Sequence, residues 1–244
     1  IWSLYEDDEG LIWIGSPFKG VSRLNPKTNT FKHYRHQPSQ PHSINSAPVL
    51  AIFQDHAKDL WMGTLGRGLN RFNKTTQTFS QYTHDSDDVT SLNNATRIDA
   101  IIEDSEHFLW FGTNKGVSRL DPDRKRFSHF EHDSTDPTSI GSNRITALFE
   151  DSQQQVWLGT NKQGLDKFNK ASGTFSHYRH DPDDRRSLGS HNIYSIYQTD
   201  DGILWLGTAA GLDRFDPSTH SFRHFGRQQG LSNETVMGVM GDKS

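Results

Sequence analysis

Apolar and polar residues alternate in short runs along the chain, and one such run returns at nearly constant intervals. Its sequence is Leu-Trp-Leu-Gly-Thr at 204–208, and four earlier stretches have almost the same sequence: 12–16, 60–64, 109–113 and 156–160. Their tryptophans follow one another at intervals of 48, 49, 47 and 48 residues. A fixed period of this size is typical of a chain built from one supersecondary unit copied in tandem.

Each copy predicts four β-strands. The first is an alternating run with a small residue at its centre, and the second contains the repeated tryptophan and glycine. A polar, mostly acidic turn joins these two strands, a Gly-Leu or Gly-Val pair opens the third, and aromatic residues mark the fourth. The predicted first strands are 1–5, 49–53, 98–102, 145–149 and 193–197.

Four antiparallel strands in each unit of about 50 residues predict an all-β fold, a β-propeller built of four-stranded antiparallel blades. We interpret 1–244 as a single propeller array with five complete repeats, and 236–240 has the pattern of the first strand of a sixth. That extra strand indicates a piece of a larger propeller. The blades are expected at about 1–36, 47–84, 96–132, 143–180 and 191–225, with a further blade beginning at 233–244.

The repeated core resembles the two-component regulator propeller family, whose blades carry Asp-x-x-Gly-x-[Leu/Ile]-Trp-[Ile/Leu]-Gly-Thr. The stretches 7–16 and 200–208 match this core, whereas copies two to four keep the acidic residue, as Asp55, Asp104 and Asp151, but lack the turn glycine. The resemblance covers the chain in five copies. It implies a periplasmic sensor portion of an inner-membrane receptor, often one for glycan fragments, that precedes a histidine kinase or a diguanylate cyclase.

Composition narrows the classes of partner. The net charge is −4, with 26 basic and 30 acidic residues, which argues against a nucleic-acid surface because phosphate binding needs a basic excess. No cysteine is present, so disulfides and thiolate chemistry are excluded. No apolar run is long enough to span a bilayer, and we expect no membrane insertion of this segment.

Comparison between the copies separates scaffold from site. Residues that recur at one position in every copy are interpreted as scaffold, which applies to the tryptophans and to the glycine two residues after each of them. We expect no metal and no cofactor. The histidine pairs His33 with His36 and His177 with His180 are three residues apart on an outer strand, so they should face opposite sides of the sheet. The acidic turns are expected to be solvated, because hairpin turns favour aspartate for backbone reasons.

Positions that vary between copies, on the loops where propellers receive ligands, are the candidate site. The loops between the second and third strands and the connections before the first strands are expected to open on one face. Arginine and lysine gather there, and arginine can bind a carboxylate or sulfate with two hydrogen bonds. The alternative is that these cations only keep the loops soluble. The candidate ligand-binding residues are Phe18, Lys19, Arg67, Arg97, Lys115, Asn143, Arg144, Lys162, His191 and Asn192.

Three functions compete at this point. The first is a ligand-sensing extracytoplasmic module that binds a small anionic or glycan ligand, or a partner, and signals to downstream domains of the parent chain. The second is a structural or dimerisation scaffold without its own ligand, and a homodimer stays open. The third is a propeller lyase-like enzyme, for which His191 alone is a weak candidate. We predict a non-enzymatic sensor.

Overall fold

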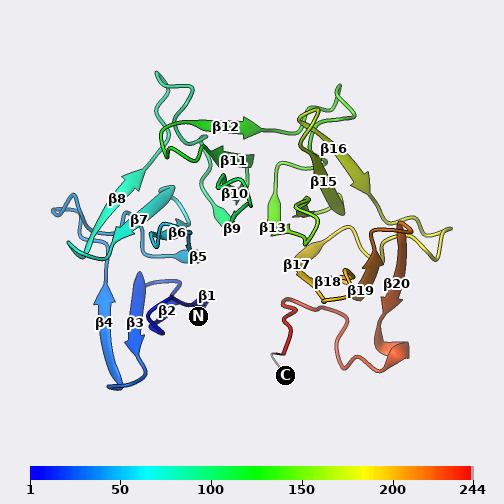
Figure 1. Cartoon of the computed structure of the whole chain (residues 1–244), viewed down its shortest axis with the longest axis horizontal. Coiled ribbons are helices and arrows are strands. Elements are labelled where there is room, and N and C mark those ends of the chain that lie inside the picture. Colours follow the sequence, from blue (N-terminus) through cyan, green and yellow to red (C-terminus); the bar gives the residue numbers. More distant parts are fainter. Residues whose placement is uncertain (243–244) are drawn as a thin grey trace. The chain divides into compact units, whose positions relative to one another are not determined.

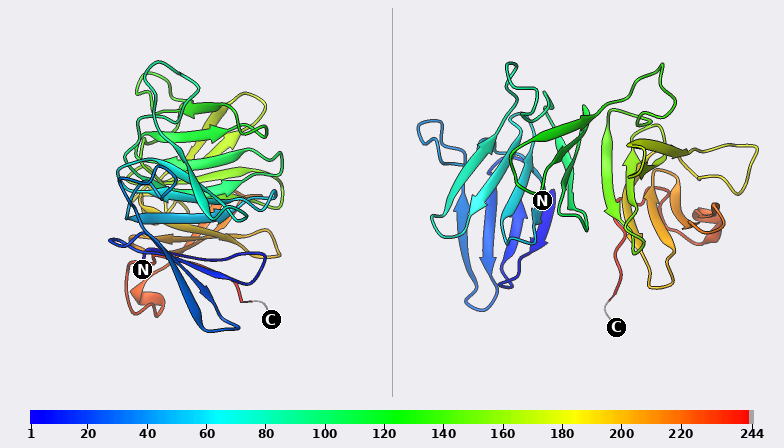
Figure 2. Two further views of the ribbon diagram at one scale, coloured as in Figure 1. Left: turned by 90° about the vertical axis from the view of Figure 1, so that its left-hand side faces the viewer. Right: turned by 45° about the horizontal axis from the view of Figure 1, so that its top comes forward.

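Each of the five predicted blades contains β-strands in the structure (Figure 1). The computed structural model describes residues 1–242, which form five four-stranded sheets and one short 3₁₀ helix, η1 (Arg227–Gln229). In every sheet the strands lie side by side in the order of the chain, and the paired strands run antiparallel (Figure 2). The all-β prediction and the prediction of four-stranded blades are therefore confirmed.

The strand bounds follow the repeat. In the first two sheets they are β1 (Ser3–Glu6), β2 (Ile12–Gly15), β3 (Val21–Asn25), β4 (Thr30–Tyr34), β5 (Val49–Gln54), β6 (Leu60–Thr64), β7 (Leu69–Asn73) and β8 (Thr78–Tyr82). In the third and fourth they are β9 (Ile98–Glu103), β10 (Leu109–Thr113), β11 (Gly116–Leu120), β12 (Phe127–Phe130), β13 (Ile145–Glu150), β14 (Val156–Thr160), β15 (Leu165–Asn169) and β16 (Thr174–Tyr178). In the fifth they are β17 (Ile193–Gln198), β18 (Leu204–Thr208), β19 (Gly211–Asp216) and β20 (Ser221–Phe225).

The chain divides into two compact units, Ile1–His129 and Phe130–Ser244. The first unit holds the first three sheets and the second holds the last two, with the division falling at the end of β12. Inside each unit the first strands of successive sheets contact each other, β5 with β1 and β9 in the first unit and β13 with β17 in the second. The single array predicted for the whole chain stays a prediction.

The recurring small residues and glycines explain how successive sheets pack. Within each sheet the small residue at the centre of the first strand is the cross-strand partner of the glycine in the second, as Ala51 is of Gly63. A side chain from the next sheet then covers this pair. A Cβ atom added to Gly63 would lie 2.7 Å from Ile98 Cγ2 and 2.8 Å from the Ile98 carbonyl oxygen. The glycine is therefore required by close approach, as the comparison between copies predicted.

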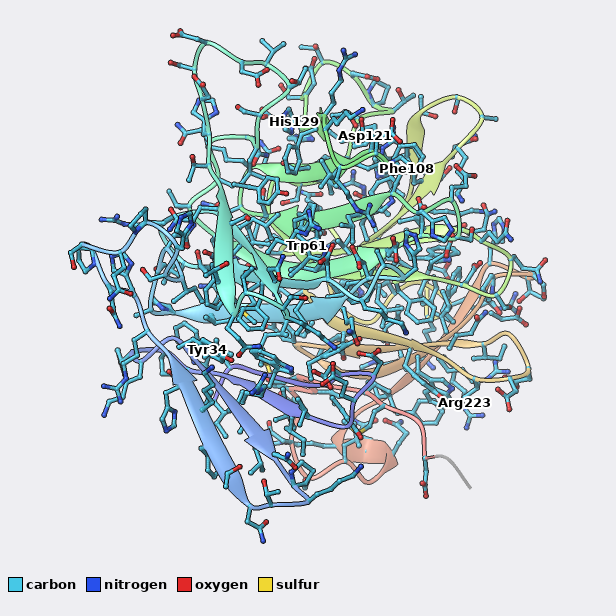
Figure 3. The ribbon with its side chains drawn as sticks, turned by 60° about the vertical axis from the view of Figure 1, so that its left-hand side comes forward. Tyr34, Trp61, Phe108, Asp121, His129 and Arg223 are labelled. Atoms are coloured by element: carbon cyan, nitrogen blue, oxygen red, sulfur yellow. The ribbon has the colours of Figure 1, made fainter. Side chains whose placement is uncertain are left out.

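Three of the repeated tryptophans, Trp13, Trp61 and Trp157, pack against the next sheet of their unit. Trp13, Trp61, Trp110 and Trp157 are at most 1% exposed, and each forms part of the apolar core (Figure 3 marks Trp61). Trp13 packs edge-on against Phe72 of the second sheet with ring centroids 5.0 Å apart, and Trp157 contacts Phe215 of the fifth sheet at 5.5 Å. Such contacts bury large apolar areas and favour one orientation of the rings. The interpretation of the tryptophans as scaffold agrees with this packing.

In the turns of the first four sheets one aspartate is buried, which corrects the expectation that these turns are simply solvated. Asp151 is 6% exposed; its Oδ1 accepts the backbone N–H groups of Gln153 and Gln155, and its Oδ2 accepts the indole N–H of Trp157 at 2.7 Å. Asp7, Asp55 and Asp104 accept the indole N–H of their own tryptophans at 2.8, 2.9 and 2.7 Å. A buried indole N–H needs an acceptor, and the aspartate six residues earlier supplies it.

The fifth sheet departs from this arrangement. Its residue six positions before the tryptophan is Thr199, not Asp200, and the Thr199 hydroxyl donates instead to Asp201 at 2.6 Å. Trp205 is also more exposed than the other four tryptophans. The sequence match of 200–208 to the repeated core therefore does not reproduce the buried hydrogen bond of the other copies.

The segment predicted as the first strand of a sixth copy, 236–240, forms no strand. Its first residue nevertheless takes the place that first strands occupy elsewhere. The Val236 N–H donates to the Thr208 carbonyl at 2.9 Å, as the Val49 N–H does to the Ser16 carbonyl at 3.2 Å. Val236 also covers Gly207 as Ile98 covers Gly63. A further blade beginning at 233–244 stays a prediction, and 243–244 lie outside the described residues.

Candidate functional site

Within each unit, hydrogen bonds join the loops between second and third strands to the connections that lead into first strands, either of the same sheet or of the next one. The Gly66 N–H donates to the Thr96 carbonyl, and the Asn161 N–H donates to the Arg144 carbonyl at 2.9 Å. The Leu65 N–H donates to Pro48 at 3.0 Å. The expected neighbourhood of these two kinds of segment is thus present in both units, and we call their shared surface the loop side of each unit.

The five candidate residues of the first unit do not form a single cluster. Phe18 is 84% exposed and lines a hollow of about 490 Å³ together with Lys19 and Arg35. Arg67 lines a second hollow. Lys115 is exposed, and its backbone is fixed by the Thr113 hydroxyl.

Arg97 forms an ion pair within the protein. Its Nε lies 2.7 Å from both carboxylate oxygens of Asp99, two residues further along β9. Alternate residues of a strand point to the same side, which brings this pair together. The positive charge of Arg97 is therefore largely balanced inside the protein, so Arg67 is the better probe of an anionic ligand.

Two of the five candidate residues of the second unit hold loops in place. Asn143 Oδ1 accepts the backbone N–H of His132 at 2.7 Å, and Asn192 Oδ1 accepts that of Lys162 at 2.8 Å. The ring of His191 meets that of His180 edge to face, with centroids 5.4 Å apart. The side chains of Arg144 and Lys162 are exposed. Two asparagines proposed as ligand-binding residues thus have a structural role as well.

The hollow at Arg67 combines a cation with several polar groups. Its volume is about 350 Å³. Among residues 1–242 no ion pair or hydrogen bond of the Arg67 guanidinium is found, while its carbonyl accepts from the Asn45 side chain. The lining consists of His36, Asn45, Gly66, Arg67, Gly68, Gln81, Thr83, His84, Leu92, Asn94, Ala95 and Thr96.

The two histidines of this hollow have a defined tautomer. His36 Nδ1 lies 2.8 Å from the Ile44 carbonyl, and His84 Nδ1 lies 3.1 Å from the Leu92 carbonyl. A carbonyl only accepts, so Nδ1 carries the proton in both rings and the neutral rings keep Nε2 as an acceptor. The sequence did not indicate that these two histidines line a hollow, because histidines recur at the equivalent positions His132 and His180 and a repeated residue is interpreted as scaffold. In the structure His132 and His180 do make the same hydrogen bond to a carbonyl.

The histidine pairs considered for metal binding have other partners. His33 Nδ1 is hydrogen-bonded to the Ser22 hydroxyl at 2.8 Å, and His36 follows β4 instead of belonging to it. His177 Nδ1 lies 2.6 Å from Asp166 Oδ1, with His180 beyond the end of β16. His33 and His177 thus connect a fourth strand to the third, whereas His36 and His180 bind carbonyl groups within the connection that follows the fourth strand.

Two of these cross-strand contacts, one in the fourth sheet and one in the fifth, join a histidine to an aspartate. Asp166 is fully buried and also accepts the Gly141 N–H at 2.7 Å. The hydrogen bond to Asp166 raises the pKa of His177, against the opposing effect of burial. In the fifth sheet, burial raises the pKa of Asp213, although the bond from His224 opposes it. The second sheet places uncharged Asn70 and Gln81 at the same positions.

We expect the His177 pair to make stability depend on pH. A raised histidine pKa stabilises the folded state fully below the unfolded value of 6.5, and this contribution is lost as the pH rises through the folded pKa. Replacing the pair with the residues of the second sheet, Asp166→Asn with His177→Gln, should remove it. Urea denaturation from pH 5.5 to 9 should show wild type losing stability relative to the double variant; a constant difference would contradict the prediction.

Comparison with known proteins supports the repeat. The sequence model described as "Two component regulator propeller" matches residues 1–18, 91–115, 139–162 and 187–210. No curated protein matches the sequence. No helix among residues 1–242 combines the length and the apolar character that crossing a membrane requires.

Solved structures share the fold. The extracellular domain of a protein described as a hybrid two-component system of B. thetaiotaomicron aligns with 98% of this chain at 24% identity and a TM-score of 0.79. PorZ, a surface component of the type-IX secretion system of Porphyromonas gingivalis, aligns with 96% at 16% identity and 0.70. A gluconolactonase of Xanthomonas campestris aligns with 93% at 13% identity and 0.58.

The chain spans 30% of the length of the first of these structures, 35% of PorZ and 73% of the gluconolactonase. At these identities the likeness concerns the fold. The match of the sequence model confirms the resemblance drawn from the repeated Trp-x-Gly-Thr core: four stretches of this chain are similar to the two-component regulator propeller repeat.

Proposed function

We propose that this chain is part of the extracytoplasmic sensor portion of a hybrid two-component receptor, and that it lies in the periplasm. The repeats that match the family model support this proposal, as does the likeness of the fold to the extracellular domain of a hybrid two-component system. The downstream signalling domains would belong to the parent chain. The gluconolactonase likeness is one of fold alone, and we propose no catalytic role.

We further propose that a small anionic or glycan ligand binds at the Arg67 hollow. The observation that carries this is the combination of a guanidinium, two histidine Nε2 atoms and an amide side chain in one open hollow of about 350 Å³. A guanidinium binds a carboxylate with two parallel hydrogen bonds, and amides and imidazoles suit hydroxyl groups. An acidic oligosaccharide, such as one with uronic acid units, offers both kinds of group.

Substituting Arg67 tests this assignment. Arg67→Met keeps the length of the side chain and removes its charge, so the affinity for an acidic oligosaccharide should fall by about 10- to 100-fold, which corresponds to one charged hydrogen-bonded pair. Isothermal titration calorimetry with matched acidic and neutral oligosaccharides measures the change.

Lys19→Met is the matched control, because Lys19 is exposed on the loop side and lines the other hollow. Its affinity should equal that of wild type. Equal loss in both variants would indicate a general effect of charge and would reject the Arg67 hollow. An absence of saturable binding to the wild type would instead favour the scaffold function considered from the sequence.

A further inference from the structure

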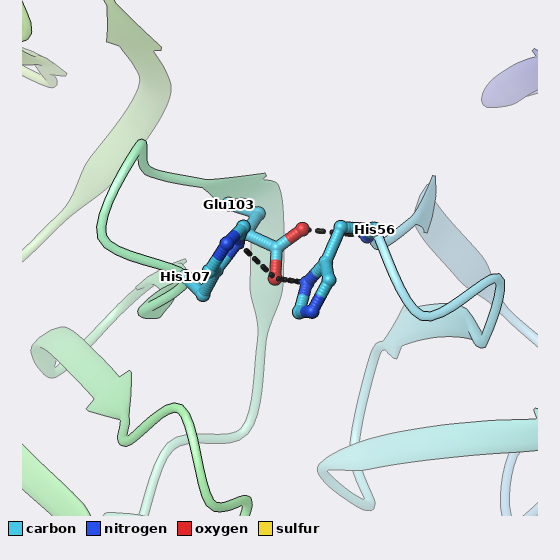
Figure 4. A group of neighbouring side chains, drawn as sticks. All are labelled: His56, Glu103 and His107. Carbon is cyan, nitrogen blue, oxygen red and sulfur yellow. Dashed lines mark hydrogen bonds and ion pairs between the residues drawn. The ribbon is translucent and has the colours of Figure 1, made fainter.

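A second group of ionisable side chains lies away from the loop side of the first unit, at the turns that join first and second strands. His56 belongs to the turn between β5 and β6, Glu103 is the last residue of β9, and His107 belongs to the turn between β9 and β10 (Figure 4). The second and third sheets thus bring together residues that are about one repeat apart. Nothing in the sequence pattern pointed to this group.

Both histidines present Nδ1 to the same carboxylate. Glu103 Oε1 lies 2.6 Å from His56 Nδ1 and 3.8 Å from His107 Nδ1, and one ligand atom from each residue lies within 4.8 Å of the others. The two rings stack with centroids 3.8 Å apart. The histidine side chains are about half exposed, at 48% and 52%, whereas that of Glu103 is 8% exposed. About half of each imidazole side chain is therefore open to solvent, whereas the carboxylate lies beneath them.

The carboxylate is held in place and ionised. Glu103 Oε2 accepts the backbone N–H of His56 at 2.7 Å, and Arg124 donates to Oε1 at 2.6 Å while also contacting Asp55. Burial would raise the pKa of Glu103, but the bonds from His56 and Arg124 outweigh it and keep that pKa below its ordinary value. A carboxylate has about four acceptor positions, so Oε1 can serve Arg124 and a second partner together.

The repeat itself provides an internal control for the scaffold explanation. Gln54 and Gln198 occupy the position of Glu103 in their sheets, and their Oε1 atoms accept the turn N–H groups of Asp8 and Ser152 at 2.8 and 2.7 Å. A glutamine therefore suffices for the contact between sheets. His107 has a positive φ of 66°, where the fourth sheet has Gln154 at 59°. The negative charge of Glu103 is paired with Arg124, and Glu150 has the same position in the fourth sheet, but the contact between the sheets does not require the two imidazoles.

We propose that His56 Nδ1, His107 Nδ1 and Glu103 Oε1 form a binding site for a divalent transition-metal ion of the Zn²⁺ type. Two imidazoles and one carboxylate are a donor set that Zn²⁺ accepts at about 2.0–2.2 Å, which places tetrahedral donor atoms about 3.3 Å apart. The 2.6 Å separation has to widen by about 0.7 Å and the 3.8 Å separation has to shorten by about 0.5 Å, and the two imidazole donors, which lie within 4.8 Å of each other, have to approach to the same spacing. Water would complete the coordination on the exposed side.

A bound ion would connect the second and third sheets. Because it binds the folded chain, Zn²⁺ should raise the unfolding temperature of the protein. The expected stoichiometry is one ion per chain, which equilibrium dialysis against Zn²⁺ alone measures directly.

Three substitutions copy residues that the chain already uses at the equivalent positions: His56→Ser, as at Ser152; Glu103→Gln, as at Gln54; and His107→Gln, as at Gln154. Each should weaken Zn²⁺ binding by more than about tenfold, since even the loss of an outer partner of a metal site has an effect of that size. Urea denaturation without metal reports whether each variant is folded, and His107→Gln should be as stable as wild type.

His42→Gln is the matched control, because His42 is exposed and lies outside the cluster. It should keep wild-type Zn²⁺ affinity and the stabilisation by Zn²⁺. The proposal is overturned if wild type binds no Zn²⁺ at one ion per chain, or if folded His107→Gln and Glu103→Gln bind as tightly as His42→Gln.

Discussion

Asp151→Ala is expected to lower the free energy of unfolding by about 3 kcal/mol or more. The substitution leaves three donors without an acceptor: the buried indole N–H of Trp157 and the backbone N–H groups of Gln153 and Gln155. A buried donor that loses its partner costs about 1–3 kcal/mol, and the backbone donors can recover part of this from water. Urea denaturation followed by tryptophan fluorescence measures the change.

The control for this prediction removes the same charge from a comparable turn. Asp200 is exposed in the turn between β17 and β18. Asp200→Ala should change the free energy of unfolding by less than about 0.5 kcal/mol, as most surface substitutions do. Similar effects of the two variants would mean that net charge, and not the hydrogen bond to the indole, accounts for the loss.

The second large effect is expected at Gly63. In Gly63→Ala the new methyl group would meet Ile98 Cγ2 at 2.7 Å and the Ile98 carbonyl oxygen at 2.8 Å, so the second and third sheets have to move apart. Overpacking of a closely packed site costs about 1–3 kcal/mol, and the upper end applies because a backbone atom cannot rotate away. The free energy of unfolding in urea should fall by about that amount.

Gly238→Ala is the matched control, because no atom lies within 4 Å of its added Cβ and its φ is not positive. Its stability should stay within about 0.5 kcal/mol of wild type. Combining Gly63→Ala with Ile98→Ala should cost less than the sum of the two single changes, since the contact with Ile98 Cγ2 disappears, while the contacts with the carbonyl oxygen and Cβ of residue 98 remain. Additive effects would show that the Cγ2 contact contributes nothing to the cost of Gly63→Ala.

The sequence predicts a structural role most clearly for the residues that are repeated in every copy. Trp13 and Gly15 recur at one spacing, so their scaffold role and the four-stranded sheets around them followed from periodicity. The buried aspartates also had a signal, a constant spacing of six residues to the tryptophan in four copies. The acidic residues alone indicate only a turn, because aspartate favours turns whether or not its side chain is buried.

Candidate site residues were harder to judge, because their roles depend on neighbours from other strands. Arg97 was counted as a free cation, and only the strand geometry brings Asp99 to its guanidinium. Asn143 and Asn192 were proposed for ligand binding, and the structure gives both a backbone group to hold. Whether the ten candidate residues bind a ligand is left to the experiment with Arg67→Met.

The sequence by itself determined the repeat, the all-β fold and the division between shared scaffold and variable loops, because each of these depends on local alternation and fixed spacing within one chain segment. Only the tertiary structure decided which charges are paired and which side chains converge. His56 and Glu103 are 47 residues apart and meet because consecutive sheets pack face to face. The contact from the turn N–H recurs in other sheets, as from Asp8 to Gln54, whereas the combination of two imidazoles with one carboxylate is found at a single place among residues 1–242 and therefore leaves no periodic trace in the sequence.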